Sequence, residues 1–223
     1  MTEKVIIIGH SIAAEIIYSI ISRDPRINVA AFTVHRSFID KPVLFDKPIV
    51  PFESLAETYP PSEYKIINAI GYGNVNKNRG KIFLEAKLLG YSPLTYIHAS
   101  ASNFSQEIGE GVFIMPGAVI EPFSLIGANT FIWSNVVIAH HARIDENCWI
   151  ASGAVVSGGA RVKRNCFLGV NATIVNKVVI EEYNIIGAQT LIAKNTSAHG
   201  VYISRPGEHH RFSSDDYAKH ILV

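Results

Sequence analysis

Aliphatic side chains recur every six residues through the second half of the chain. The series runs from Ile108 to Ile192, and each of its fifteen positions holds Ile, Leu or Val. A period of six fits neither an α-helix, which has 3.6 residues per turn, nor the two-residue alternation of a strand. It fits a triangular coil in which each flat side takes one hexad, so that 18 residues make one coil. One predicted column of five stacked coils contains Ile108, Ile126, Ile144, Val162 and Ile180.

The fifth residue of each hexad is small or compact, from Val112 to Thr196, with Asn184 as the exception. With aliphatic columns inside and each short strand bonded to the coils above and below, the pattern predicts a left-handed parallel β-helix. Each buried aliphatic side chain contributes about 1.5–3 kcal/mol before the entropy cost of ordering it. Fifteen such positions therefore outweigh local propensities.

The first 95 residues follow a different pattern, which is typical of an α/β unit. Strands are predicted at 5–8, 29–34 and 64–70, and helices over 12–21 and 77–89. The apolar positions of the second helix are Ile82, Leu84, Leu88 and Leu89. Alternating strands and helices imply a small parallel sheet whose ligands bind beyond the carboxyl ends of the strands. The predicted organisation is an α/β domain over 1–95, a β-helix over 96–206 and a C-terminal tail over 207–223.

Composition and charge exclude several classes of protein. Of the 223 residues, 48% are hydrophobic and 17% are charged, which is typical of a packed globular protein. A net charge of +1 provides no broad field that would attract nucleic acid or an anionic membrane. Two cysteines are too few for a disulfide framework, and the apolar run at 5–8 is too short for a signal peptide or a membrane span. We therefore expect a cytoplasmic protein with no membrane insertion.

The hexads and the segments that flank them resemble the hexapeptide-repeat acyltransferases. The flanking segments read Tyr-Ile-His-Ala-Ser-Ala at 96–101 and Gly-Val-Tyr-Ile-Ser-Arg-Pro at 200–206. With the α/β prefix they narrow the resemblance to the bacterial branch of sialic acid O-acetyltransferases and nucleotide-amino-sugar N-acetyltransferases. The resemblance implies a Rossmann-like N-terminal domain and a homotrimer. It also implies that acetyl-CoA binds between the β-helices of neighbouring subunits as co-substrate, with no metal required.

Two histidines lie within the hexads, His140 and His141, at a corner where side chains should point out of the coil. Acyl transfer from a thioester needs a base for the proton of the attacking amine or hydroxyl, and an imidazole titrates near neutral pH. The alternative is a surface histidine pair at a subunit contact, but the resemblance implies that His140 is the base. Family members commonly follow the base with an orienting carboxylate, where this chain has His141. Glu121, eighteen residues before Ala139, is the expected substitute unless it is only a solvated corner carboxylate.

Several residues are expected to bind acetyl-CoA. Gly158 follows His140 by one coil and matches the family's glycine, so its N–H is the expected oxyanion donor, although Gly158 and Gly159 are also consistent with a tight corner. The resemblance implies that Trp149 occupies the position where relatives often carry a second histidine near the acetyl group. The cations expected near the CoA phosphates are Lys177, Lys194 and Arg205.

Two loops of the α/β unit are expected to bind the substrate. The first strand is followed by Gly9, His10 and Ser11, which keep one glycine where dinucleotide folds keep three. The resemblance implies that the nucleotide sugar binds at this turn and at Gly71, Tyr72, Gly73 and Asn74. Acidic residues that relatives present after the second strand are missing, and Arg36 there favours an anion, so the nucleotide stays open. Both loops are expected to face the same side of the molecule as His140.

The preferred interpretation is an acetyl-CoA-dependent N-acetyltransferase that acts on the amino group of a nucleotide-linked deoxyamino sugar for surface glycans such as the lipopolysaccharide O-antigen. O-acetylation of a sialic acid or another sugar hydroxyl is the alternative. A β-helical metalloenzyme would need three histidines around zinc, and the hexads contain two adjacent ones. A non-catalytic trimeric scaffold is the remaining interpretation.

Overall fold

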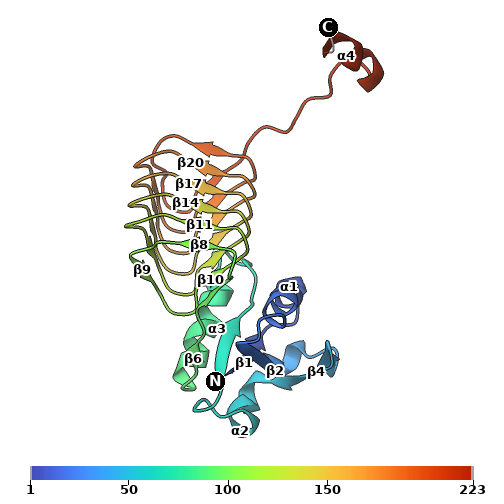
Figure 1. Ribbon diagram of the computed structural model, residues 1–223, viewed down its shortest axis with the longest axis vertical. Helices are drawn as coiled ribbons and strands as arrows, with labels where there is room; N and C mark the ends of the chain where they lie inside the picture. The colour runs from blue at the N-terminus through green and yellow to red at the C-terminus, as the bar shows by residue number, and fades with distance from the viewer. Residues whose placement is uncertain (1, 222–223) are drawn as a thin grey trace.

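The computed structural model describes residues 2–221. An α/β unit lies at one end of a triangular coil, and the chain leaves the other end of the coil as an extended segment that leads to helix α4 (Ser214–Ile221) (Figure 1). Residues 203–213 and the described side chains of α4 are exposed. Among the described residues, no helix combines the length and apolar character needed to cross a bilayer.

The coil has three faces, each a parallel sheet of two-residue strands. Face 1 contains β7 (Tyr96–Ile97), β10 (Phe113–Ile114), β13 (Phe131–Ile132), β16 (Trp149–Ile150), β19 (Phe167–Leu168), β22 (Ile185–Ile186) and β24 (Val201–Tyr202). Face 2 contains β8 (Ser102–Asn103), β11 (Val119–Ile120), β14 (Val137–Ile138), β17 (Val155–Val156), β20 (Thr173–Ile174) and β23 (Leu191–Ile192). Face 3 contains β9 (Glu107–Ile108), β12 (Leu125–Ile126), β15 (Arg143–Ile144), β18 (Arg161–Val162) and β21 (Val179–Ile180).

The predicted aliphatic columns form the core of the coil. Ile126 pairs with Ile108 on one side and with Ile144 on the other, which is the 18-residue register that the hexads predict. Fourteen of the fifteen hexad positions are buried, and Ile108 at the first coil is partly buried. The left-handed β-helix is therefore confirmed. Asn184, the exception at the fifth position, is buried and donates hydrogen bonds to the carbonyls of Glu181 and Ser197.

The corners explain a second feature of the repeat. From Gly111 to Gln189, every sixth residue has a positive φ, the left-handed conformation that Gly and Asn adopt most readily. The chain accordingly has Gly or Asn at most of these positions, and His141 occupies one of them with φ 59°.

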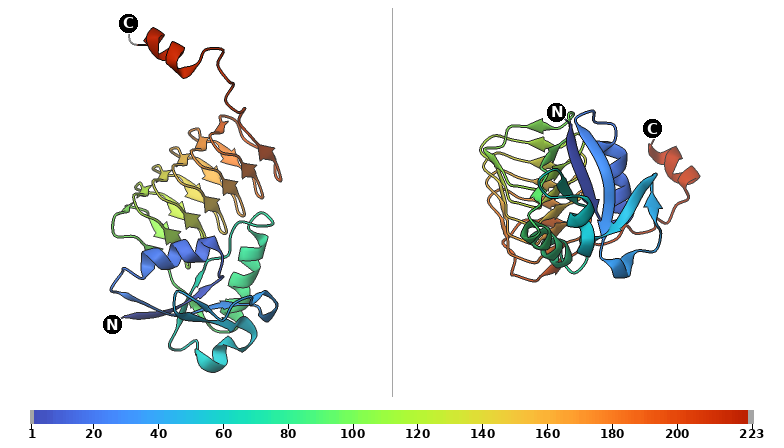
Figure 2. Two further views of the ribbon diagram at one scale, coloured as in Figure 1. Left: turned by 90° about the vertical axis from the view of Figure 1, so that its right-hand side faces the viewer. Right: turned by 90° about the horizontal axis from the view of Figure 1, so that it is seen from below.

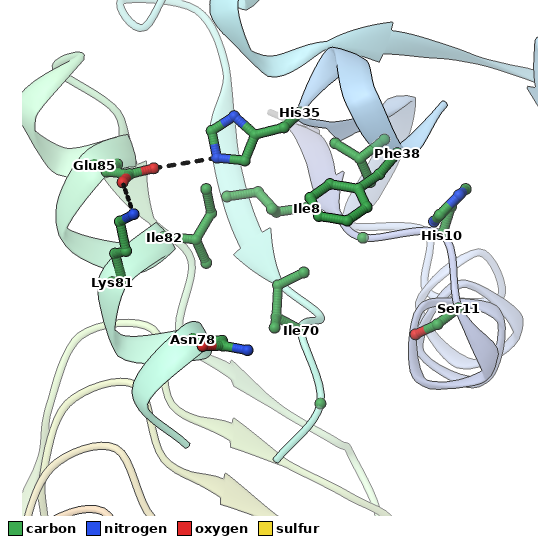
Figure 3. A pocket seen from close by; sticks show the side chains of 13 residues that line it. Ile8, His10, Ser11, His35, Phe38, Ile70, Asn78, Lys81, Ile82 and Glu85 are labelled. Atoms are coloured by element: carbon green, nitrogen blue, oxygen red, sulfur yellow. Dashed lines mark ion pairs between the residues drawn. The ribbon is translucent and has the colours of Figure 1, made fainter. Parts of the chain in front are cut away.

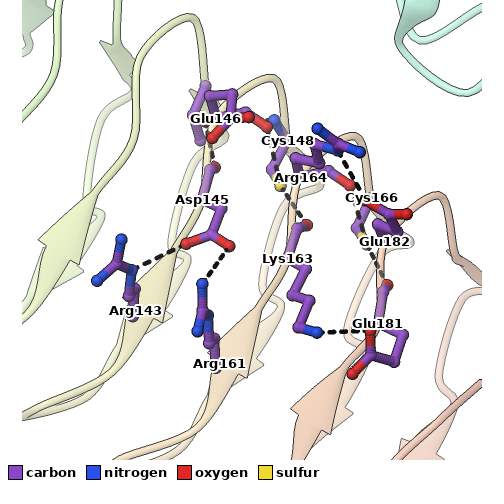
Figure 4. Close-up of polar contacts among 11 residues, drawn as sticks. Arg143, Asp145, Glu146, Cys148, Arg161, Lys163, Arg164, Cys166, Glu181 and Glu182 are labelled. Carbon is purple, nitrogen blue, oxygen red and sulfur yellow. Dashed lines mark hydrogen bonds and ion pairs between the residues drawn. The ribbon is translucent and has the colours of Figure 1, made fainter. Parts of the chain in front are cut away.

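The outer surfaces of the three faces differ in chemistry. On face 1, Phe113, Phe131 and Trp149 form a stack with ring centroids 5.1–5.4 Å apart. On face 2, Val119, Val137 and Val155 lie half-buried. Face 3 carries charges that neutralise one another, since Asp145 contacts Arg143 and Arg161 at 2.9 Å each and Lys163 contacts Glu181 at 2.6 Å (Figure 4).

The N-terminal unit is an open sheet in the order β3-β4-β2-β1-β5-β6. β1 (Glu3–Ile8), β2 (Ile27–Val34), β4 (Lys47–Pro51), β5 (Lys65–Asn68) and β6 (Ser92–Pro93) are parallel, and β3 (Val43–Leu44) is antiparallel to β4. The remaining elements are α1 (Ile12–Ile21), η1 (Arg36–Phe38), η2 (Phe52–Ser54), α2 (Leu55–Thr58) and α3 (Lys77–Leu88). The three predicted strands and two predicted helices are thus present, and β4 is a further strand that contains Pro48 and Pro51 and that the hydrophobic pattern does not predict.

The N-terminal unit and face 1 share one apolar cluster. Val5, Ile17 and Phe32 of the unit belong to the same buried group as Phe131 and Trp149 of the coil. Two views show α1 and α3 against the first coils (Figures 1 and 2). The burial of α3 differs from the prediction, because Leu84 and Leu88 are exposed while Arg79, Ile82 and Phe83 are buried. The reason is that α3 contacts the coil through residues near its start, such as Arg79, and not through a row of aliphatic side chains along its whole length.

Arg79 joins α3 to the coil. Its guanidinium is fully buried and donates to the carbonyl oxygens of Asn129, Asn147 and Cys148, in two successive coils. Burial lowers its pKa to about 9, so the group keeps its charge at neutral pH. The neighbouring Asn76 extends this contact to a third coil by donating to the carbonyl of Cys166 at 3.0 Å.

Candidate functional site

His140 and His141 lie at the corner between β14 of face 2 and β15 of face 3, with exposed side chains. The Nδ1 atoms of the two rings are 3.2 Å apart, so one ring must donate and the other accept if both are neutral. His141 also packs on Phe123, one coil earlier, with ring centroids 4.9 Å apart. The corner therefore presents two exposed imidazoles that contact each other through Nδ1.

The structure brings Glu121 to the predicted corner, but the contact differs from the expected one. Its Oε2 accepts a hydrogen bond from the backbone N–H of His140 at 2.8 Å. The expectation that Glu121 orients the ring of His140 is thus corrected within one chain. Its carboxylate holds the backbone of the turn, and the ring of His140 contacts His141 instead. The cause is the register, because Glu121 lies one coil before Ala139 and its side chain extends to the next peptide N–H.

Gly158 lies directly against His140. A β-carbon at Gly158 would lie 2.6 Å from Cε1 and 2.8 Å from Nε2 of the imidazole, so only glycine leaves room for this ring. The carbonyl oxygen of Gly158 accepts a hydrogen bond from the backbone N–H of Lys177. The N–H of Gly158 itself has no acceptor among the described residues. A free backbone N–H thus lies beside an exposed imidazole, which is the combination that the sequence predicts for a base and an oxyanion donor.

The cations expected at the coenzyme are divided between two corners. Lys177 follows His141 by two coils, and its Cγ is 3.4 Å from the position of a β-carbon on Gly159. Lys194 follows His140 by three coils along the same corner and is exposed. Arg205 follows β24 of face 1, at the corner between faces 1 and 2, and is not brought together with His140 in one chain.

Trp149 does not contact this corner, which corrects the expectation that it binds acetyl-CoA. It lies on face 1 and is 6% exposed. Its ring packs on Phe131, Trp133 and Tyr72 at centroid distances of 5.1–5.5 Å, and Arg79 lies over it at 5.8 Å. The physical reason is that this position of the hexad points out of face 1, which the N-terminal unit covers.

A cavity of about 500 Å³ opens in the N-terminal unit where the strand order reverses, between β1 and β5 (Figure 3). In open parallel sheets ligands bind at this point, beyond the carboxyl ends of the strands. The predicted residues Gly9, His10, Ser11 and Gly71 line it. His10 Nε2 lies 3.1 Å from Asp40 Oδ1.

Sequence reasoning missed a second set of residues in the cavity. His35 at the end of β2 and Asn78, Lys81 and Glu85 of α3 line it together with Phe38. The spacing of Asn78, Lys81 and Glu85 puts three polar side chains on one face of a helix, but no local pattern links them to His35.

Four expected substrate residues lie outside the lining of this cavity. Arg36 is exposed in η1, and its backbone N–H donates to Glu53. Tyr72 packs on Trp149 and Phe167 of the coil. Gly73 and Asn74 precede α3, where Asn74 Nδ2 donates to Asn78 Oδ1 at 3.4 Å. The chain after Gly71 turns toward the coil and α3, and this removes Tyr72 to Asn74 from the lining.

The cavity and His140 lie on different sides of one chain. The N-terminal unit packs on face 1, and His140 lies at the corner between faces 2 and 3, which is the corner opposite face 1 in a triangle. All residues that line the cavity belong to the N-terminal unit. The expectation that both substrate loops face the same side as His140 is therefore wrong for an isolated chain, because the docking of the α/β unit is set by the aromatic stack of face 1.

Among residues 2–221, no group of three or more His, Cys, Asp and Glu side chains is arranged to hold a metal ion. Cys148 and Cys166 are buried inside the coil, where burial raises the pKa of the Cys148 thiol well above its usual value.

One family model matches the part of the chain that contains most of the coil. The family model described as the GMPPB C-terminal domain matches residues 108–216. No curated protein matches the chain.

Comparison with solved structures extends the similarity to nearly the whole chain. Perosamine N-acetyltransferase from Caulobacter crescentus, a histidine variant in complex with CoA and GDP-perosamine, is 26% identical with a TM-score of 0.82, covering 92% of this chain and 95% of that chain. The acetyltransferase domain of PglB from Neisseria gonorrhoeae FA1090 is 20% identical with a TM-score of 0.81, covering 93% and 99%. WeeI from Acinetobacter baumannii AYE is 17% identical with a TM-score of 0.79, covering 92% and 98%. The resemblance to the sugar N-acetyltransferase branch of the hexapeptide-repeat acyltransferases is thus confirmed.

Proposed function

We propose that this protein transfers an acetyl group from acetyl-CoA to the amino group of a nucleotide-linked deoxyamino sugar. The similarity to perosamine N-acetyltransferase, whose structure contains CoA and GDP-perosamine, supports the reaction class and both substrates. The observation that carries the proposal is the contact between the exposed His140 ring and Gly158, whose N–H is free among the described residues. We further propose a cytoplasmic reaction that supplies surface glycans such as the O-antigen.

In the proposed reaction, His140 is the general base. The sugar amine attacks the thioester carbonyl, a C–N bond forms, and the imidazole accepts the proton that the nitrogen loses. The negative charge that develops on the carbonyl oxygen is stabilised by the N–H of Gly158. The C–S bond then breaks, and the departing CoA thiolate takes the proton from His140. The proximity of the His140 ring to Gly158 supports this assignment, because a base and an oxyanion donor must both lie close to the thioester carbonyl.

The N-terminal unit is proposed to be a Rossmann-like domain that binds the nucleotide sugar. Its parallel strands have the order β4-β2-β1-β5-β6, which reverses between β1 and β5 as in dinucleotide-binding sheets. In the same proposal residues 1–95 bind the acceptor, 96–206 form the acyltransferase β-helix and 207–223 are a tail. The cavity at the strand reversal supports this division.

The active protein is proposed to be a homotrimer with acetyl-CoA between neighbouring coils. In one chain the cavity and His140 lie on different sides, so a complete site needs the cavity of one subunit and the base of the next. The chemistry of the faces supports such an assembly. The N-terminal unit covers face 1 over its first coils, and face 3 neutralises its own charges. Face 2, in contrast, presents Val119, Val137 and Val155 and the 64% exposed Leu191.

Lys177 and Lys194 are the preferred cations for the CoA phosphates, since both follow the His140 corner along the coil. Arg205 lies at another corner, so in this proposal it contacts the CoA phosphates only where acetyl-CoA lies between its own coil and that of a neighbouring subunit. Trp149 has no part in coenzyme binding.

A direct test measures the release of CoA thiol from acetyl-CoA with amino- and hydroxy-sugar nucleotides as acceptors. Turnover with a nucleotide amino sugar, and mass spectrometry that locates the acetyl group on nitrogen, is the expected result. Transfer to hydroxyl groups alone would favour the O-acetyltransferase alternative, and no turnover with any acceptor would contradict the proposed function.

A further inference from the structure

One end of the cavity is a polar cluster built from two elements that are far apart in the sequence. Glu85 of α3 faces His35 at the end of β2, with His35 Nε2 3.3 Å from Glu85 Oε2 (Figure 3). Lys81, one turn earlier in α3, lies 3.7 Å from Glu85 Oε1. The opposite end is formed by the turn at Gly9–Ser11 that begins α1. The cavity thus has a carboxylate at one end and backbone N–H groups of a helix start at the other.

His35 fixes the direction of the Glu85 carboxylate. The other ring nitrogen of His35, Nδ1, lies 3.1 Å from Glu53 Oε1. Glu53 is itself held by backbone N–H groups, its own and that of Arg36, and these contacts lower the pKa of its carboxyl. The imidazole is therefore held from both sides, and Glu85 is held by the imidazole.

Glu85 has hydrogen-bonding capacity left for a ligand. A carboxylate offers about four acceptor positions. The ion pairs of Glu85 with His35 at 3.3 Å and Lys81 at 3.7 Å occupy at most two of them. The Glu85 side chain is 31% exposed and lines the cavity, so the remaining positions are accessible from it. Phe38, on the same cavity, is 64% exposed and offers a ring on which a planar base can stack.

We propose that Glu85 selects a guanine nucleotide by accepting hydrogen bonds from N1–H and the exocyclic N2–H₂ of the base. This inference rests on the proposed function and names the nucleotide of its acceptor. Guanine is the base that presents two adjacent N–H donors on its Watson–Crick edge, and a carboxylate matches both at once. Uracil presents one N–H between two carbonyls, which repel a carboxylate, and adenine presents an amino group beside a ring acceptor.

The test compares nucleoside diphosphates that differ in these donors. Calorimetric titration of the full-length protein with GDP, IDP and UDP measures the contribution of each group, because IDP keeps N1–H and lacks the exocyclic amine. We expect GDP to bind about 10- to 100-fold more tightly than UDP and IDP to fall between them, since hydrogen bonds to a charged group are stronger than neutral ones. Glu85→Gln should reduce the GDP-to-IDP ratio to near one and leave UDP affinity within about three-fold. Glu57→Gln, an equal charge change on an exposed residue of α2, should leave all ratios unchanged.

Other outcomes overturn the inference in distinguishable ways. UDP that binds as tightly as GDP, or a GDP-to-IDP ratio that survives Glu85→Gln, would show that Glu85 does not read the base while leaving acetyl transfer intact. Absence of binding by any nucleotide would overturn the inference together with the acceptor site. Failure of acetyl-CoA turnover with GDP binding retained would contradict the proposed function and leave the base selectivity standing.

Discussion

The imidazole of His140 lies against the α-carbon of Gly158, eighteen residues later in the chain. A β-carbon on Gly158 would be 2.6 Å from Cε1 of that ring, well inside contact distance. The repeat that builds the coil thus also sets the distance between the two groups, because residues one coil apart are neighbours at the same corner.

Gly158→Ala is expected to displace the His140 ring and to lower kcat by about 10²-fold or more, because base and oxyanion donor lose their alignment. The fold should survive, since a corner side chain has room to move toward solvent. Steady-state kinetics with a circular dichroism melt measures both effects. Ser152→Ala, at the same position of its hexad on another corner, is the control and should behave as the wild type. Wild-type kcat for Gly158→Ala would contradict the alignment.

Glu121 is expected to act through the backbone of the turn. Its Oε2 accepts from the N–H of His140, and a glutamine oxygen can accept the same bond. Glu121→Gln should therefore keep kcat within about three-fold, whereas Glu121→Ala should lower it by about 10-fold as the turn loosens. If Glu121→Gln were as damaging as Glu121→Ala, the negative charge rather than the hydrogen bond would be required.

Two inactive variants are expected to restore activity when their subunits are mixed. His140→Ala removes the base, and Gly71→Trp fills the cavity, where a β-carbon on Gly71 would meet no atom within 4 Å. In trimers with shared sites, about a quarter of the sites in an equal random mixture combine an intact base with an intact cavity. Co-expression with two affinity tags and assay of the mixed trimers measures this recovery. No activity in mixed trimers of verified composition would mean that each site belongs to one chain.

Arg79→Met is expected to destabilise the protein by about 2–5 kcal/mol, because the carbonyls of Asn129, Asn147 and Cys148 lose a buried donor. Urea unfolding gives this free energy. Arg164→Met, which removes an exposed pair with Glu182, is the control and should cost less than about 1 kcal/mol. Equal effects of the two substitutions would argue against Arg79 as the joint between the two units.

The repeat predicts the coil because the same six residues that separate two aliphatic side chains also form one side of the triangular coil. The column from Ile108 to Ile180 has the predicted register. The same count of eighteen brings Gly158 beside His140 and Lys177 beside Gly159. In the N-terminal unit, the apolar run at 5–8 predicts the first strand and the helical spacing of apolar residues predicts the helix over 12–21. The turn between them lines the cavity.

The remaining features depend on contacts between segments that no local period records. The burial of Trp149 depends on which face the N-terminal unit covers. The residue before each inward aliphatic differs by face: it is aromatic at 113, 131, 149 and 167, aliphatic at 119, 137 and 155, and charged at 143 and 161. The aromatic series indicates the face that another part of the chain covers. Arg79 and the pair His35–Glu85 carry no local signal, since their partners are 50–69 residues away for Arg79 and 50 for His35.

The most direct test of the central claim is the turnover of acetyl-CoA with a nucleotide amino sugar by His140→Ala. If His140 is the general base, kcat should fall by about 10²- to 10⁴-fold while the affinity for acetyl-CoA and the melting temperature stay near those of the wild type. Wild-type turnover in a correctly folded His140→Ala protein would contradict the account.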